Sequence, residues 1–102
     1  AFVRQALKIV VNHLEDSDFS KEEFAREMGV STSLLFKKIK ALTDMTVVDF
    51  IRSIRMDHAM KLLNDRQYSI GEIAYKCGFS SISYFSTVFK KHFGKSPTDF
   101  RA

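Results

Sequence analysis

The 102-residue sequence predicts an all-α fold in which two helix-turn-helix lobes are joined by a long linker helix, with about seven helices in total. Three observations predict it. Apolar residues recur at helical spacing in successive segments. The pattern Ser-x-x-Glu, typical of a helix start, occurs twice. Each copy is followed by Ala-x-x-x-Gly, in which the Gly supplies a tight turn.

The two copies keep a constant offset of 49 residues up to the turn. The paired residues are Ser20 and Ser69, Glu23 and Glu72, Ala25 and Ala74, and Gly29 and Gly78. Beyond the turn the offset becomes 50, and Leu35, Ile39, Asp49 and Phe50 correspond to Phe85, Phe89, Asp99 and Phe100. The pattern indicates one duplicated unit and predicts a complete capping box, with reciprocal Ser and Glu hydrogen bonds, in both copies. Two copies are too few for a solenoid.

The first half of the chain predicts three helices. An apolar stripe over residues 2–14 predicts a supporting helix that covers the first lobe. Ser20 caps a second helix that runs to Met28, and Ser31 caps a third after the turn at residues 29–31. On this third helix the i, i+4, i+7 spacing predicts that three residues face the core: Leu35, Ile39 and Leu42.

Residues 46–64 predict the linker helix, opened by Thr46 with Asp49 at its third position. Roughly 18 residues span about 27 Å, whereas successive major-groove faces of a DNA duplex lie about 34 Å apart. Such a helix could hold two DNA-contacting elements approximately one turn apart. Arg52 and Arg55 on it are expected to contact phosphates or to form intramolecular pairs, with the intramolecular role favoured for Arg55.

The second lobe, residues 65–102, predicts a helix with Ile70, Ile73, Ala74 and Cys77 packed inward. A longer helix follows over about residues 81–93. Its expected core residues are Phe85, Val88, Phe89 and Phe93. Ser96 then caps a last turn with Pro97 at its first position, and Phe100 closes the lobe.

Basic residues are unevenly distributed. The net charge is +4; residues 1–50 carry seven Lys/Arg against eight Asp/Glu, and residues 51–102 carry nine against four. The clusters are Lys37, Lys38 and Lys40, and Lys90, Lys91 and Lys95, each on or just after the second helix of a lobe. Such faces suit phosphates, although an ordinary solvated helix face has the same pattern. The duplication favours nucleic acid.

Phe36 is a large apolar residue on the polar face of its helix. Two interpretations are open: it contacts a thymine methyl group or a sugar edge, or it folds back against the stem of Lys40 or against the preceding helix.

From Ile70 to Arg101 the chain reads I-x-x-I-A-x-x-x-G-F-x-S-x-x-Y-F-x-x-x-F-K-K-x-F-G-x-S-P-x-x-F-R. This motif resembles the AraC/XylS family of bacterial transcription regulators, and the resemblance covers nearly the whole chain. The first half, from Asp18 to Arg55, also looks like the output domain of hybrid two-component sensor-regulators of gut bacteria. The resemblance implies two helix-turn-helix lobes that bind double-stranded promoter DNA.

Transferred residue by residue, the resemblance implies two sets of DNA contacts. The base-facing residues would be Thr32, Ser33, Phe36 and Lys37 in the first lobe and Ile82, Ser83, Ser86 and Thr87 in the second. Phosphate contacts would fall to Ser31, Lys40, Ser81, Tyr84, Lys90 and Lys91, together with backbone amides at Ser96. Many relatives have Arg and Gln at base-facing positions where this chain has Ser, Thr, Ile and Phe, so specificity is expected to depend on methyl contacts, water and DNA shape.

The expected partners follow from the same resemblance. They are double-stranded promoter DNA, RNA polymerase as a second contact, and a second copy in a dimeric parent protein. No cofactor and no small-molecule ligand are expected for this stretch. The lone Cys77 fits a reducing compartment. The missing initiator Met suggests a fragment of a longer protein. The expected location of a DNA-binding output domain is the cytoplasm, with the parent chain anchored in the inner membrane.

An enzyme is not expected. His13, His58 and His92 fall on separate helices with no Cys or carboxylate at ligand spacing, Cys77 lies on an apolar face, and no Gly-rich phosphate loop is present. The alternative that stays open is a helical protein-interaction module. Its groove-binding face would need more apolar anchors than Phe36 and Ile82 supply.

Overall fold

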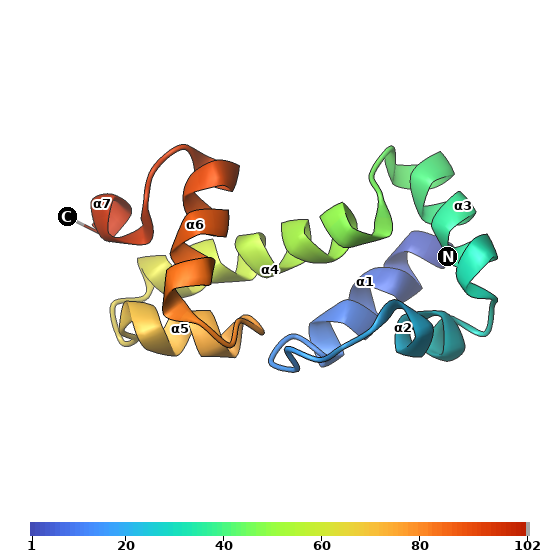
Figure 1. Cartoon of the computed structure of the whole chain (residues 1–102), viewed down its shortest axis with the longest axis horizontal. Helices are drawn as coiled ribbons and strands as arrows, with labels where there is room; N and C mark the ends of the chain where they lie inside the picture. Colours follow the sequence, from blue (N-terminus) through green and yellow to red (C-terminus); the bar gives the residue numbers. More distant parts are fainter. Residues whose placement is uncertain (102) are drawn as a thin grey trace. The chain divides into compact units, whose positions relative to one another are not determined.

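The computed structural model describes residues 1–101, which form seven α-helices and no β-strand (Figure 1). The helices are α1 (Phe2–Asn12), α2 (Lys21–Met28), α3 (Thr32–Thr43), α4 (Val47–Asn64), α5 (Ile70–Lys76), α6 (Ile82–Phe93) and α7 (Pro97–Arg101). The predicted all-α class is confirmed. The first helix ends at Asn12 rather than Leu14.

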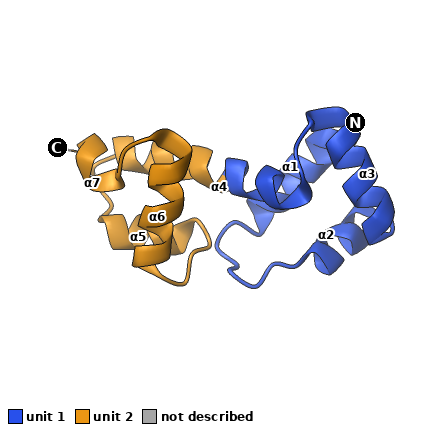
Figure 2. Cartoon of the chain, turned by 45° about the horizontal axis from the view of Figure 1, so that its top comes forward, with its two compact units in different colours: residues 1–54 blue, residues 55–102 orange. Residues whose placement is uncertain are grey.

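The chain divides into two compact units, the first comprising Ala1–Ile54 and the second starting at Arg55 (Figure 2). The division falls within α4, which has 18 residues and contributes side chains to both units. Each unit has a hydrophobic core of its own. The fold therefore provides two separately packed helix-turn-helix units on one chain.

In the first unit, α1 packs against both α2 and α3. The fully buried side chains include Ala6, Phe24, Leu35 and Ile39. The predicted core position of Leu42 is wrong, because its side chain is 57% exposed. Leu42 lies in the last turn of α3, the chain then turns at Asp44 with φ +63°, and the next apolar residues on this core are Met45 and Val47.

In the second unit, α5 and α7 both pack against α6. The buried core residues are Met56, Ala59, Leu63, Ile73, Ala74, Cys77, Phe79, Phe85, Val88 and Phe89. Ile73, Ala74 and Cys77 are buried as predicted, whereas Ile70 and Phe93 are only partly buried. Met56 is completely buried and was not among the expected core residues.

Two arginine side chains donate hydrogen bonds to backbone carbonyl groups of the second unit. Arg55 Nη1 donates a hydrogen bond to the Gly78 carbonyl oxygen at 3.2 Å, so its intramolecular role is confirmed. Arg101 donates to the Tyr68 carbonyl oxygen and, at 3.2 Å, to the Leu63 carbonyl oxygen. These bonds attach α7 to the end of α4 and to the segment that leads into α5.

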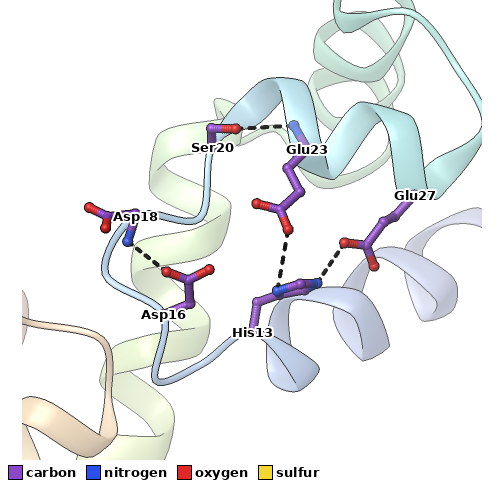
Figure 3. A network of polar contacts seen from close by, with 6 residues as sticks. All are labelled: His13, Asp16, Asp18, Ser20, Glu23 and Glu27. Carbon is purple, nitrogen blue, oxygen red and sulfur yellow. Dashed lines mark hydrogen bonds and ion pairs between the residues drawn. The ribbon is translucent and has the colours of Figure 1, made fainter.

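The two Ser-x-x-Glu motifs differ in the structure. Ser69 and Glu72 form the predicted capping box, with the Ser69 amide donating to Glu72 Oε1 at 2.9 Å and the Glu72 amide donating to Ser69 Oγ at 3.1 Å. Ser20 caps α2 by accepting from the Glu23 amide at 3.1 Å. The prediction of a full box in this first copy is wrong, because the Glu23 carboxylate lies beside His13 instead (Figure 3).

Candidate nucleic-acid interface

The turn between α2 and α3 sets the direction of α3 in the first unit. Gly29 ends α2 in the left-handed conformation with φ +73°, which costs a residue with a Cβ atom far more than Gly. The Val30 amide donates to the Ala25 carbonyl oxygen at 3.1 Å. Ser31 then caps α3 by accepting from the Leu34 amide at 3.1 Å, as predicted.

The outer face of α3 carries the first set of candidate DNA-contacting residues. Ser33, Phe36 and Lys37 are exposed, and Thr32 is partly buried. The ammonium group of Lys21 lies 5.7 Å from the centroid of the Phe36 ring, a cation–π geometry. Phe36 thus contacts the preceding helix and still exposes 41% of its surface, which leaves room for a base or sugar.

Lys40 has an intramolecular partner. Its ammonium group lies 3.1 Å from the Asp44 carbonyl oxygen and 3.7 Å from Asp44 Oδ1. Both side chains are largely exposed, and exposed pairs of this kind contribute little stability. A DNA phosphate could therefore compete for Lys40, with a smaller gain than for an unpaired lysine.

The second turn repeats the first with an aromatic addition. Gly78 has φ +85°, and the Phe79 amide donates to the Ala74 carbonyl oxygen at 3.0 Å. Phe79 is buried and packs edge-on against Phe85, with ring centroids 5.3 Å apart. This packing fixes the start of α6. Ser81 caps that helix by accepting from the Tyr84 amide at 3.2 Å.

The outer face of α6 carries the second set. Ser81, Ile82, Ser83, Tyr84, Thr87, Lys90 and Lys91 are exposed, and Ser86 is partly buried. The Thr87 hydroxyl donates to the Ser83 carbonyl oxygen at 3.1 Å. With its proton engaged inside the helix, Thr87 can offer a base only an acceptor and a methyl group.

Neither α3 nor α6 contains an acidic residue. The sequence of α3 is TSLLFKKIKALT and that of α6 is ISYFSTVFKKHF. The helices before them contain Glu22, Glu23 and Glu27 in α2 and Glu72 in α5. The second helix of each unit is thus the element suited to a polyanion.

The predicted phosphate site at Ser96 has competing groups. Ser96 Oγ accepts from the Asp99 amide at 3.1 Å, and Asp99 places a carboxylate in the first turn of α7. A negative side chain there occupies the position that an anion would take. The start of α7 is therefore less suited to an anion than the lysine-bearing faces of α3 and α6.

Comparison with known proteins agrees with this geometry. A family model described as a helix-turn-helix domain matches residues 24–102, and solved structures of similar sequence include an AraC-type regulator from Chromobacterium violaceum. The chain belongs to the AraC/XylS family. This domain type binds DNA in transcription regulators and is not an enzyme.

Proteins similar to this chain have names that describe different kinds of protein. "Histidine kinase P4" of Formosa agariphila is 38% identical over 99 residues, which cover 97% of this chain and 7% of that protein. The C-terminal domain of AraT, a response regulator of Geobacillus stearothermophilus, has a TM-score of 0.90 at 35% identity and covers 98% of this chain and 83% of that one. The DNA-binding domain of AdpA, solved with a target DNA, has a TM-score of 0.88 at 25% identity, with coverages of 98% and 89%. The chain spans only 7% to 36% of the length of the first curated relatives that it matches.

Lys21, at the start of α2, was not predicted from the sequence. It places a positive charge beside Phe36 on the candidate face of α3, and its position at the start of the helix before α3 was the signal that could have indicated it. The Arg52 Nη1 atom lies 3.5 Å from Asp49 Oδ1, so this arginine already has an acidic neighbour.

Over residues 1–101, none of the helices has the length and apolar character needed to span a membrane.

Proposed function

We propose that α3 and α6 are the recognition helices of a sequence-specific reader of double-stranded promoter DNA, each entering a major-groove segment. The observation that carries this proposal is the combination of duplicated helix-turn-helix units with two second helices that lack carboxylates and expose lysines. A helix of this kind fits the major groove, where base edges differ for all four base pairs.

Within this proposal the residues divide by role. Thr32, Ser33, Phe36 and Lys37 contact bases in the first groove segment, and Ile82, Ser83, Ser86 and Thr87 do so in the second. The phosphate contacts are Ser31, Lys40, Ser81, Tyr84, Lys90 and Lys91. Since only Lys37 among the base-facing side chains carries a charge, methyl contacts and DNA shape are expected to supply much of the specificity.

The division into a first lobe (1–45), a linker helix (46–64) and a second lobe (65–102) belongs to the same proposal. So does a spacing of about one DNA turn between the contacted segments. The similarity to a histidine kinase and to a response regulator domain supports an output domain of a two-component regulator in the cytoplasm. The proposed parent is dimeric and contacts RNA polymerase, with an anchor in the inner membrane.

Selection on a random double-stranded DNA library, at near-physiological salt with excess unspecific competitor, tests the proposal. Two conserved blocks about one helical turn apart are expected. Recovery of a single block would mean that one unit alone contacts bases. If no sequence is enriched, even with an artificially dimerised chain that removes weak monomer affinity, DNA reading is contradicted and the protein-interaction module is favoured.

Salt dependence provides a second test. Lysines that neutralise phosphates release counterions, so the logarithm of affinity should fall linearly with the logarithm of salt concentration, with a slope of about −0.9 for each phosphate neutralised. A flat salt response would contradict nucleic-acid binding.

A further inference from the structure

His13 lies between two carboxylates of α2 (Figure 3). Its Nε2 atom is 2.6 Å from Glu27 Oε2, and its Nδ1 atom is 3.8 Å from Glu23 Oε2. The sequence spacing did not indicate this contact, because Glu23 and Glu27 belong to the next helix, 10 and 14 residues after His13. One potential ligand atom from each of the three residues falls within 4.8 Å of the other two.

Local structure holds these three side chains in place. Glu23 and Glu27 are four residues apart on α2, so both project from the same side of that helix. The His13 ring stacks on Phe19, with centroids 4.3 Å apart and an angle of 12° between the planes. Ser20 alone caps the start of α2, which leaves the Glu23 carboxylate directed at the imidazole rather than at the cap (Figure 3).

We propose that His13, Glu23 and Glu27 form a binding site for a divalent transition-metal ion such as Zn²⁺. One imidazole and two carboxylates form a mixed nitrogen and oxygen donor set. Such a set suits Zn²⁺ better than it suits Ca²⁺ or Mg²⁺, which prefer oxygen ligands alone. Three protein ligands leave a fourth tetrahedral position for water. The side chains are 22%, 33% and 38% exposed, so an ion and its water can reach them.

The distances need only a small adjustment to hold an ion. Zn²⁺ bonds of about 2.0–2.2 Å put tetrahedral ligand atoms roughly 3.3–3.6 Å apart. The two carboxylates face different nitrogens of the His13 ring, and one ion can bind only one of these nitrogens. One ring nitrogen lies within 4.8 Å of an oxygen of each carboxylate, so binding at that nitrogen requires the farther carboxylate to approach by about 1 Å.

The site joins the end of α1 to α2 without using the proposed DNA-contacting face. Lys21, which lies beside Phe36 of α3, is two residues from Glu23, and residues with that separation point to different sides of a helix. Metal binding is therefore expected to stabilise the first unit and to leave DNA affinity unchanged. The competing explanation is that the three residues form only an internal ion pair.

Titration of the metal-free chain with CoCl₂, followed by visible absorption, tests the site. A saturable signal at one Co²⁺ per chain is expected, with displacement by ZnCl₂. Glu27→Gln and His13→Gln each remove a proposed ligand and should weaken binding by more than about 10-fold, since loss of an outer-shell partner alone typically costs about 10–100-fold. His92→Gln is the matched control, because His92 is exposed on α6 and should keep the wild-type affinity. Circular dichroism of each variant verifies that it is folded.

Thermal unfolding gives an independent measurement. At a free Zn²⁺ concentration 100 times Kd, the folding equilibrium of the wild-type chain should shift about 100-fold toward the native state, and Glu27→Gln should lose this shift. Absence of saturable Co²⁺ binding would overturn the proposal and leave an ion pair only. Equal affinity in the wild type, His13→Gln and Glu27→Gln would also overturn it, by placing the metal elsewhere.

Discussion

The side chain of Ile82 packs over Gly71. A Cβ atom added to Gly71 would lie 3.0 Å from Ile82 Cδ1 and 3.7 Å from Ile82 Cγ1. The first residue of α6, on the proposed DNA-contacting face, thus rests on the backbone of α5, and a side chain at position 71 would displace its end.

We expect Gly71→Ala to change base preference while leaving stability within about 1 kcal/mol of the parent. The added methyl group displaces the flexible end of Ile82, whereas alanine suits the helix better than glycine. Library selection should show the change in the second block only. Ile82→Ala should change the same block, and an unaltered block in both variants would remove Ile82 from the base contacts.

Lys37→Ala should weaken DNA binding by about 1 kcal/mol, because it removes the charged group from the first recognition face. Lys38→Ala is a matched control one residue away. The Lys38 ammonium lies 5.0 Å from the centroid of the Phe2 ring, on the side of α3 that meets α1. Equal losses for the two variants in a fluorescence anisotropy titration would show that only overall charge matters.

Thr87→Ala should relax base preference in the second block, by about 1–3 kcal/mol of discrimination if a base edge is contacted. Thr87→Val separates the two groups that Thr87 offers. Because the hydroxyl proton is bonded to Ser83, valine keeps the methyl contact and removes only the acceptor. Retained preference in the valine variant would identify a methyl contact, and unchanged preference in both variants would exclude Thr87 as a base contact.

Arg55→Met should destabilise the second unit by about 1–3 kcal/mol, since it leaves the Gly78 carbonyl oxygen without this charged donor. Arg52→Met, three residues away on the same helix, should cost less than about 1 kcal/mol, because its pair with Asp49 is exposed. Urea unfolding measures both. A larger loss for Arg52→Met would contradict the role assigned to Arg55.

The capping box at the start of α5 should make stability depend on pH. The hydrogen bond that the Ser69 amide donates to the Glu72 carboxylate lowers the pKa of Glu72 below its usual value of 4.5, and a hydrogen bond with the Ser69 side chain lowers this pKa further. Because the pKa of Glu72 is lower in the folded chain than in the unfolded chain, the ionised carboxylate stabilises the fold. This stabilisation is complete above pH 4.5, the pKa of the unfolded chain, and is lost as the pH falls through the lowered pKa of the folded chain. The stability difference between the parent and Glu72→Ala should therefore shrink on acidification. The carboxyl is fully exposed, so the effect is small.

Helix starts and turns were predictable because their chemistry is local. Ser31, Ser69 and Ser96 each cap a helix in the structure, as their spacing to the following residues indicated. Ser81 also caps α6, which was not predicted. Gly29 and Gly78 adopt the positive φ values expected at the turns. These features depend on residues within one or two helical turns of each other.

The two errors have different physical causes. Leu42 has core spacing, yet the core at the end of α3 is completed by Met45 and Val47 instead. That outcome follows from the turn at Asp44. Glu23 has the capping-box spacing, yet its carboxylate lies beside His13, the residue that follows α1. This second outcome depends on where the end of α1 lies against α2, which the local spacing does not reveal.

The division of α4 between two cores has a consequence for how the chain unfolds. Ile54 belongs to the first core, and Met56, Ala59 and Leu63 belong to the second. When one unit opens, its half of α4 loses its packing while the other half keeps its own, and a short helix without packing frays. We therefore expect two cooperative folding units whose boundary lies inside a single helix. Local melting of one unit is then expected to release α3 or α6 while the other of these two helices stays formed.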